Sequence, residues 1–147
     1  MDIRKAAEKD RRQVIEMSGA LYRSGATLHP ITDAQISRTF DEVIGGSPFA
    51  SLYIAEQEGE TAGYALLAHT YSNEAGGPVV WIEEIYIKPA FQGRGLGTQL
   101  LRFIEREYDG RAMRFRLETD HANAGAKRLY ERLGYIALAY DQLVKDR

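Results

Sequence analysis

Apolar residues recur along the chain at two spacings, and these spacings predict helices alternating with strands. "MDIRKA" predicts a short first strand around Ile3. Asp10 then has the position of an N-cap, with Gln13 three residues further on. The apolar face of the helix that follows consists of Val14, Ile15, Met17, Leu21 and Tyr22. "SGATLHP" ends this helix.

The next part of the chain predicts a second helix and then a β-hairpin. "TDAQ" at 32–35 has the form of a capping box, and Gly45-Gly46 is expected to end the helix. Its apolar face consists of Ile36, Phe40, Val43 and Ile44. Residues 49–57 and 61–71 read as antiparallel strands joined by a tight turn at 58–60.

The last part predicts a strand, a helix, a strand and a helix. Residues 79–87 are the most β-prone run, and Pro89 closes it. A glycine-rich segment leads into an apolar helix, followed by a strand at 113–119. Asn123 caps a further helix that stops at Gly134. "YIALAYDQLVK" predicts one or two final strands. Since 79–119 forms a right-handed parallel crossover beside an antiparallel hairpin, we expect one α/β domain, 1–147, with a mixed sheet.

Composition and charge exclude several classes of binding partner and catalytic site. The 147 residues carry a net charge of −2, which gives no bulk attraction to nucleic acid or to an anionic membrane. The absence of cysteine excludes thiolate catalysis and disulfides, and three scattered histidines do not suggest a metal site. No apolar run reaches the roughly 20 residues that span a bilayer, so we expect a soluble cytoplasmic protein.

The segment "QGRGLG" at 92–97 points to a bound phosphate. A helix N-terminus exposes backbone N–H groups to an anion, and glycines leave the approach unobstructed. A P-loop would need a lysine after the glycines, and a dinucleotide fingerprint would need one more residue of spacing. A plain strand-to-helix turn is the alternative explanation.

These residues resemble the GNAT superfamily of acetyl-CoA-dependent N-acetyltransferases. "QGRGLG" matches its Q/R-x-x-G-x-G/A loop, and "NAGAKRLYERLGY" at 123–135 is similar to its later N-x-x-A-x-x-L-Y element. The resemblance implies a splayed, mostly antiparallel sheet flanked by helices, with acetyl-CoA lying where the strands at 79–87 and 113–119 part. It also implies which residues bind the coenzyme: Ile85, Tyr86 and Ile87; Gln92, Gly93, Arg94, Gly95, Leu96, Gly97 and Thr98; and Asn123, Lys127 and Tyr130.

Amine acetylation requires a proton acceptor and a proton donor. An amine with a pKa of about 10.4 must lose a proton before it attacks a thioester, and a carboxylate can take that proton. Strand alternation directs only one of Glu83 and Glu84 into the site. The resemblance to polyamine-type members favours Glu83, with Glu84 in reserve, and it gives Tyr130 the role of protonating the leaving thiolate.

The sequence defines the acceptor site less clearly than the coenzyme site. His69 and Tyr71 share one strand face and are candidate acceptor contacts together with Glu83. The acidic residues Glu83, Glu84, Glu118 and Asp120 suit a small basic amine. A protein N-terminus or lysine stays open as the acceptor, as does a non-catalytic acyl-CoA sensor. A homodimer through the final strand is also expected.

Overall fold

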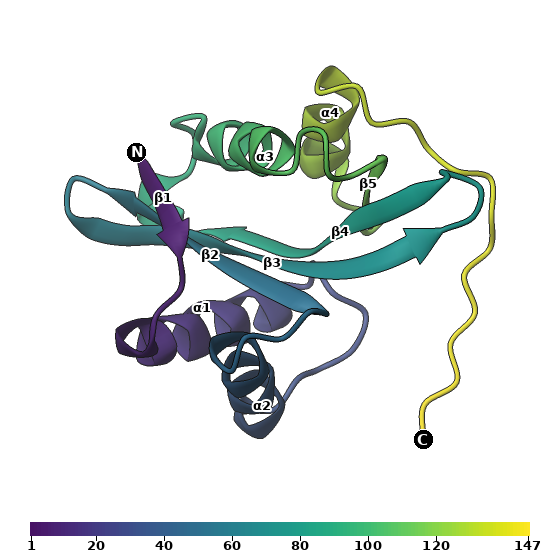
Figure 1. The fold of residues 1–147 in the computed structure, drawn as a ribbon. Coiled ribbons are helices and arrows are strands. Elements are labelled where there is room, and N and C mark those ends of the chain that lie inside the picture. The colour runs from purple at the N-terminus through teal and green to yellow at the C-terminus, as the bar shows by residue number, and fades with distance from the viewer.

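The computed structural model describes residues 1–147 as a five-stranded sheet with helices on both faces (Figure 1). The strands lie in chain order, with β1 to β4 antiparallel and β5 parallel to β4. The elements are β1 (Asp2–Lys5), η1 (Glu8–Asp10), α1 (Arg11–Arg23), α2 (Asp33–Ile44), β2 (Ala50–Gln57), β3 (Glu60–Ser72), β4 (Gly77–Ile87), η2 (Pro89–Phe91), α3 (Leu96–Glu107), β5 (Arg114–Leu117) and α4 (Ala124–Arg132). The predicted mixed, mostly antiparallel α/β fold is confirmed.

Two larger apolar cores hold the helices onto the sheet, and a smaller cluster of Ala62, Phe91 and Leu96 lies at the start of α3. Helices α1 and α2 cover one face, and α3 and α4 cover the other (Figure 1). The α1/α2 core contains Val14, Met17, Ile36, Phe40, Leu52, Ile54 and Tyr64. The α3/α4 core contains Tyr53, Ala55, Ala65, Leu67, Val80, Ile82, Leu100, Leu101, Ile104 and Tyr130. Each helix therefore binds the sheet through its periodic apolar side.

The N-cap predicted for α2 is present in the structure, whereas the one predicted for α1 is not. The predicted capping box of α2 forms: Gln35 N donates to Thr32 Oγ1, and Thr32 N donates to Gln35 Oε1. Asp10 precedes α1 as predicted, but its carboxylate does not cap that helix. It accepts hydrogen bonds from Arg4 and from the amide of Ala7 instead, because the β1 strand brings a guanidinium within reach.

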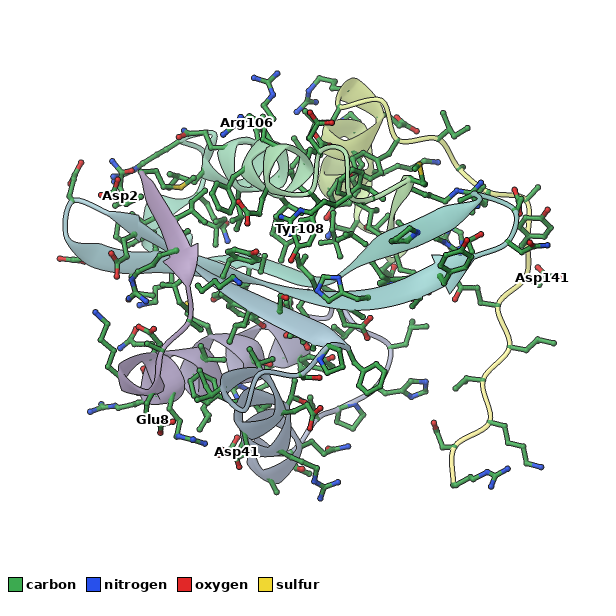
Figure 2. All side chains as sticks on the ribbon, in the orientation of Figure 1. Asp2, Glu8, Asp41, Arg106, Tyr108 and Asp141 are labelled. Carbon is green, nitrogen blue, oxygen red and sulfur yellow. The ribbon has the colours of Figure 1, made fainter.

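The predicted final strands are absent. Residues 136–147 form no backbone hydrogen bond, and Figure 1 shows this segment leaving the helices and running away from the sheet. Asp141, labelled in Figure 2, lies on it. Its apolar side chains are exposed, with Leu143 at 97%. Strand propensity alone did not produce a strand here, because a strand also requires a neighbour for its amides and carbonyls.

No helix of the structure is long and apolar enough to cross a membrane. The cytoplasmic location stays a prediction.

Candidate active site

Strands β4 and β5 separate halfway along β4. Val79 to Ile82 pair with Arg114 to Leu117, but β4 continues to Ile87 with no partner on that side. The strands therefore part as the resemblance implied. The open edge of β4 includes Ile85, Tyr86 and Ile87, whose backbone groups can pair with an extended amide-containing ligand.

A β-bulge lies where β4 leaves β5. Leu66 of β3 lies opposite Glu84 while Leu67 lies opposite Ile82, so Glu83 is the extra residue. The bulge interrupts the alternation of side chains. Ile82 belongs to the α3/α4 core, whereas Glu84 reaches residues on the α1/α2 side.

Strict alternation, on which the choice between the two glutamates was based, does not hold at this bulge, and which glutamate serves the site stays a prediction. Strict alternation would place Glu84 on the same face as Ile82, but the extra residue reverses the phase of the strand. Both carboxylates act on the same neighbour, Tyr22 of α1. Burial, the charge of Glu84, a hydrogen bond with Glu84 and then the charge of Glu83 raise the pKa of Tyr22.

Glu84 is a buried carboxylate, 8% exposed, and it forms no ion pair. Its Oε2 accepts from the hydroxyl of Tyr64 at 2.6 Å and from Ser18 Oγ at 3.3 Å. Burial and the charge of Glu84 raise the pKa of Tyr64 above its usual value, so this phenol stays a hydrogen-bond donor.

Glu83 has different surroundings. Its side chain is open to solvent, yet the protein atoms around its carboxylate raise its pKa, and the charges of Glu84 and Glu118 raise it further. A carboxylate with a raised pKa holds a proton more readily than an ordinary glutamate does, which suits a proton acceptor.

The glycine loop leaves a run of backbone amides without partners. None of the amides from Gly93 to Thr98 donates a hydrogen bond within the protein, whereas the amide of Gln92 donates to Pro89 O at 3.2 Å. Gly93 and Gly95 both have φ of +74°, in the left-handed region, and no atom lies within 4 Å of a side chain built there. The six free amides and the open space beside them fit a diphosphate.

Two side chains of the loop have distinct roles: one attaches the loop to β4, and the other supplies a positive charge. Gln92 Nε2 donates to the carbonyl of Ile87 at 2.9 Å, which ties the loop to the end of β4. The guanidinium of Arg94 lies 5.6 Å from the ring centroid of Phe91 and is exposed, so it is available to an anion.

Helix α4 carries the tyrosine of the later motif. Asn123 Oδ1 accepts from the amide of Ala126 at 3.2 Å, so the predicted cap is present. Tyr130 is 9% exposed within the α3/α4 core, and its hydroxyl makes no hydrogen bond with the protein. Burial raises the pKa of Tyr130, which keeps the phenol protonated and able to donate. Lys127 is exposed, with Glu131 4.0 Å away.

His69 and Tyr71 do not join this group. His69 lies opposite Val80, on the α3/α4 face, where Nε2 lies 2.8 Å from Ser51 Oγ and the ring centroid lies 5.4 Å from that of Tyr108. Figure 2 shows Tyr108 between α3 and the sheet. Tyr71 is 73% exposed beside Pro78. The structure thus places His69 on the face opposite to Glu84, and the acceptor role of both residues stays a prediction.

Sequence reasoning missed Ser18, Tyr22 and Tyr64. Ser18 and Tyr22 are four residues apart and share a side of α1, but the pattern indicated only an apolar helix face there. The sequence pattern indicated only that Tyr64 was an aromatic residue of a strand. A polar Ser18 within an apolar stripe was the only available signal, and it is a weak one.

Comparisons with known proteins agree on one family. Residues 20–135 match the family described as "Acetyltransferase (GNAT) family". A thialysine N-epsilon-acetyltransferase of Mus musculus is 28% identical over 141 residues, which cover 90% of this chain and 82% of the relative.

Two solved structures share the fold over nearly their whole length. A possible acetyltransferase from Clostridium difficile 630 superposes with a TM-score of 0.86 at 16% identity, covering 99% of this chain and 97% of that one. The aminoglycoside N-acetyltransferase AAC(6′)-Iy in complex with CoA gives 0.81 at 20% identity, covering 99% and 94%.

Proposed function

Since the chain belongs to the GNAT family of acetyltransferases, we propose that it transfers an acetyl group from acetyl-CoA to the primary amine of a small basic molecule. The resemblance noted in the sequence is thereby confirmed at the level of the family, and the protein is an acyltransferase that uses acetyl-CoA as co-substrate. The acceptor and the roles of individual residues are the proposal.

The observation that carries the proposal is the run of six free amides at the start of α3, directly beyond the open edge of β4. Gly93 to Thr98 would hold the diphosphate of the coenzyme, with Arg94 adding a charge-assisted contact. Ile85 to Ile87 would pair with the amides of its pantetheine arm. Asn123 and Lys127, at the start and on the surface of α4, are additional candidate contacts.

Acetyl-CoA supplies the acetyl group as a thioester, and the protein has to manage two protons. Glu83 takes a proton from the acceptor ammonium, so that the neutral nitrogen forms the new C–N bond. As the C–S bond breaks, Tyr130 donates its phenolic proton to the departing sulfur. The nitrogen then loses a second proton, which returns through solvent to the Tyr130 phenolate. Of the two protons that leave the ammonium, one thus replaces the proton given to the sulfur, and the other is released to solvent from Glu83. Glu84 would serve as an alternative proton acceptor only if Glu83 proved dispensable.

The negative charge of the site indicates the chemical class of the acceptor. Glu83, Glu84 and Glu118 put three carboxylates near the point where β4 and β5 separate, since the charges of the other two both act on Glu83. Such a site favours a cation over a neutral or acidic acceptor. The names of relatives, a thialysine acetyltransferase and an aminoglycoside acetyltransferase, are consistent with a small basic amine.

Release of CoA thiol from acetyl-CoA, measured against a panel of acceptors, tests the proposal. The panel contains diamines, basic amino acids, aminoglycosides, and peptides with a free N-terminus or an internal lysine. We expect release only with small basic amines. Release with peptides alone would favour a protein N-terminus or lysine as acceptor. Saturable CoA binding without release for any amine would favour the acyl-CoA sensor.

We also propose that two copies of the chain associate through residues 136–144. β5 has no neighbour on its outer side, and an unpaired strand edge is a ready partner for an extended segment. Ile136, Leu138 and Tyr140 alternate along the segment and are all exposed. Light scattering of the purified protein should give a dimer mass, and a chain lacking 136–147 should give a monomer. A full-length monomer at every concentration would contradict this association.

A further inference from the structure

The buried carboxylate of Glu84 has an unusual set of partners. It lies on the α1/α2 side of the sheet and has no lysine, arginine or histidine as a partner, although burying an unpaired carboxylate is costly. Hydroxyl donors replace the missing cation. Tyr64 comes from β3 and Ser18 from α1, so three elements distant in sequence meet at one oxygen.

Both hydroxyls bind the same oxygen of the carboxylate. Tyr64 and Ser18 donate to Oε2, and Tyr22 of α1 is also near enough for a side-chain hydrogen bond with this carboxylate, while Oε1 keeps some contact with solvent. Hydroxyls fix the orientation of a carboxylate without cancelling its charge, which a guanidinium or ammonium would do. Glu84 is thus held in one direction by hydroxyl donors, has no cationic partner, and keeps one oxygen in contact with solvent.

The bulge explains why this arrangement lies beside Glu83. Without the extra residue, Glu84 would face the α3/α4 core together with Ile82. The bulge instead gives two adjacent carboxylates with different surroundings: Glu83 is open to solvent with a free side chain, and Glu84 is buried and fixed. Two carboxylates in contrasting environments can take different roles in one reaction.

We propose that Tyr64 and Ser18 are positioning residues that hold the side chain of Glu84 in one orientation for binding the cationic acceptor, while Glu83 transfers the proton. This inference rests on the proposed amine acetyltransferase function and deepens it. It predicts that the pair Tyr64–Glu84 controls the KM for the acceptor and its preference for a second positive charge. The pH-independent value of kcat and the KM for acetyl-CoA are set elsewhere.

Tyr64→Phe removes the 2.6 Å hydrogen bond and keeps the ring in place. A cavity of about 30 Å³ already borders Tyr64, Ser18 and Glu84, so the loss of one oxygen should be tolerated. We expect the KM for 1,4-diaminobutane to rise about tenfold, as for a lost hydrogen bond to a charged group, with kcat and the KM for acetyl-CoA within about twofold of wild type. The KM for butylamine, which carries one charge, should rise less.

Three further variants test the interpretation. Ser18→Ala should change the acceptor KM in the same direction but less, because its hydrogen bond is longer. Tyr53→Phe is the matched control: its hydroxyl lies 3.2 Å from that of Tyr108 on the opposite side of the sheet, and its kinetic constants should match wild type. In a Glu84→Gln background, Tyr64→Phe should add no further change in acceptor KM.

The outcomes separate the possible roles. A fall in kcat at unchanged acceptor KM would overturn the proposal and make Glu84 the proton acceptor. A lower melting temperature with unchanged kinetic constants would also overturn it and leave Tyr64 with a structural role only. If the wild type acetylates no amine, the proposed function fails independently, and calorimetry with 1,4-diaminobutane decides the inference. Weaker diamine binding by Tyr64→Phe than by wild type supports it, and equal binding contradicts it.

Discussion

The two sides of the active site are built in different ways. The proposed coenzyme side is a run of consecutive residues, Gly93 to Thr98, whose backbone amides are free because the loop turns through two left-handed glycines into α3. The proposed acceptor side combines side chains from α1, β3, β4 and the segment after β5, which meet only because a bulge reorients β4.

The two sides are therefore expected to tolerate different substitutions. A backbone site depends on conformation, so its side chains can vary as long as the glycines allow the turn. A side-chain site depends on long-range packing, so a single change in register or hydroxyl alters its charge pattern. The four predictions below test this division, from the largest expected effect to the smallest.

Tyr130→Phe should have the largest effect. Loss of the proton donor is expected to lower kcat by about 10²- to 10⁴-fold while CoA affinity stays near that of wild type. Steady-state kinetics and calorimetry with CoA measure the two quantities. Tyr135→Phe is the control, since its ring lies 6.1 Å from that of Tyr130 and its buried hydroxyl has no hydrogen-bond partner. Unchanged turnover of Tyr130→Phe at every pH would remove Tyr130 from the mechanism.

Glu83→Gln should lower kcat by about 10²-fold at neutral pH, because the amine then has no proton acceptor. Activity of this variant should recover as the pH rises, since a growing fraction of the acceptor is already neutral. A pH–rate profile of the variant beside wild type measures this. Equal acid limbs for the two proteins would exclude Glu83 as the group that accepts the proton.

Gly95→Val should weaken CoA binding by about tenfold, because a branched side chain is strained at a φ of +74° and would occupy the open space beside the amides. Gly46→Val is a matched control: it imposes the same type of strain at φ +85°, with equally open space, after α2 and away from the loop. Calorimetry with CoA should show weakened binding for Gly95→Val only. Equal CoA affinities in both variants would place the diphosphate elsewhere.

Glu118→Gln should have the smallest effect, a shift in pH dependence. The charge of Glu118 raises the pKa of Glu83, so removing it lets Glu83 ionise at lower pH. The acid limb of kcat should therefore move to lower pH. The shift should be smaller than the one produced by Glu84→Gln, since Glu84 contributes more to the raised pKa. Glu60→Gln, an exposed residue at the start of β3, should leave the limb in place. A limb that moves upward in Glu118→Gln would contradict the assignment of Glu83.

The comparison also explains which predictions from sequence succeeded. The glycine turn into α3, the α2 capping box and the cap at Asn123 were predictable because each depends on residues within a few positions of one another. The last strands and the cap of α1 were predicted wrongly. Each depended on a partner elsewhere: a neighbouring strand that residues 136–147 lack, and Arg4, which takes the carboxylate of Asp10.

By itself, the sequence determined the order of helices and strands, the two apolar sides of the sheet and the glycine turn before α3, because periodicity and backbone preference act over short distances. Tertiary structure alone decided that Glu83 and Glu84 act on the same tyrosine, and that Tyr64 and Ser18 hold one of them. A strand's register is set by its neighbour, and one extra residue in that pairing reverses the face of every side chain after it.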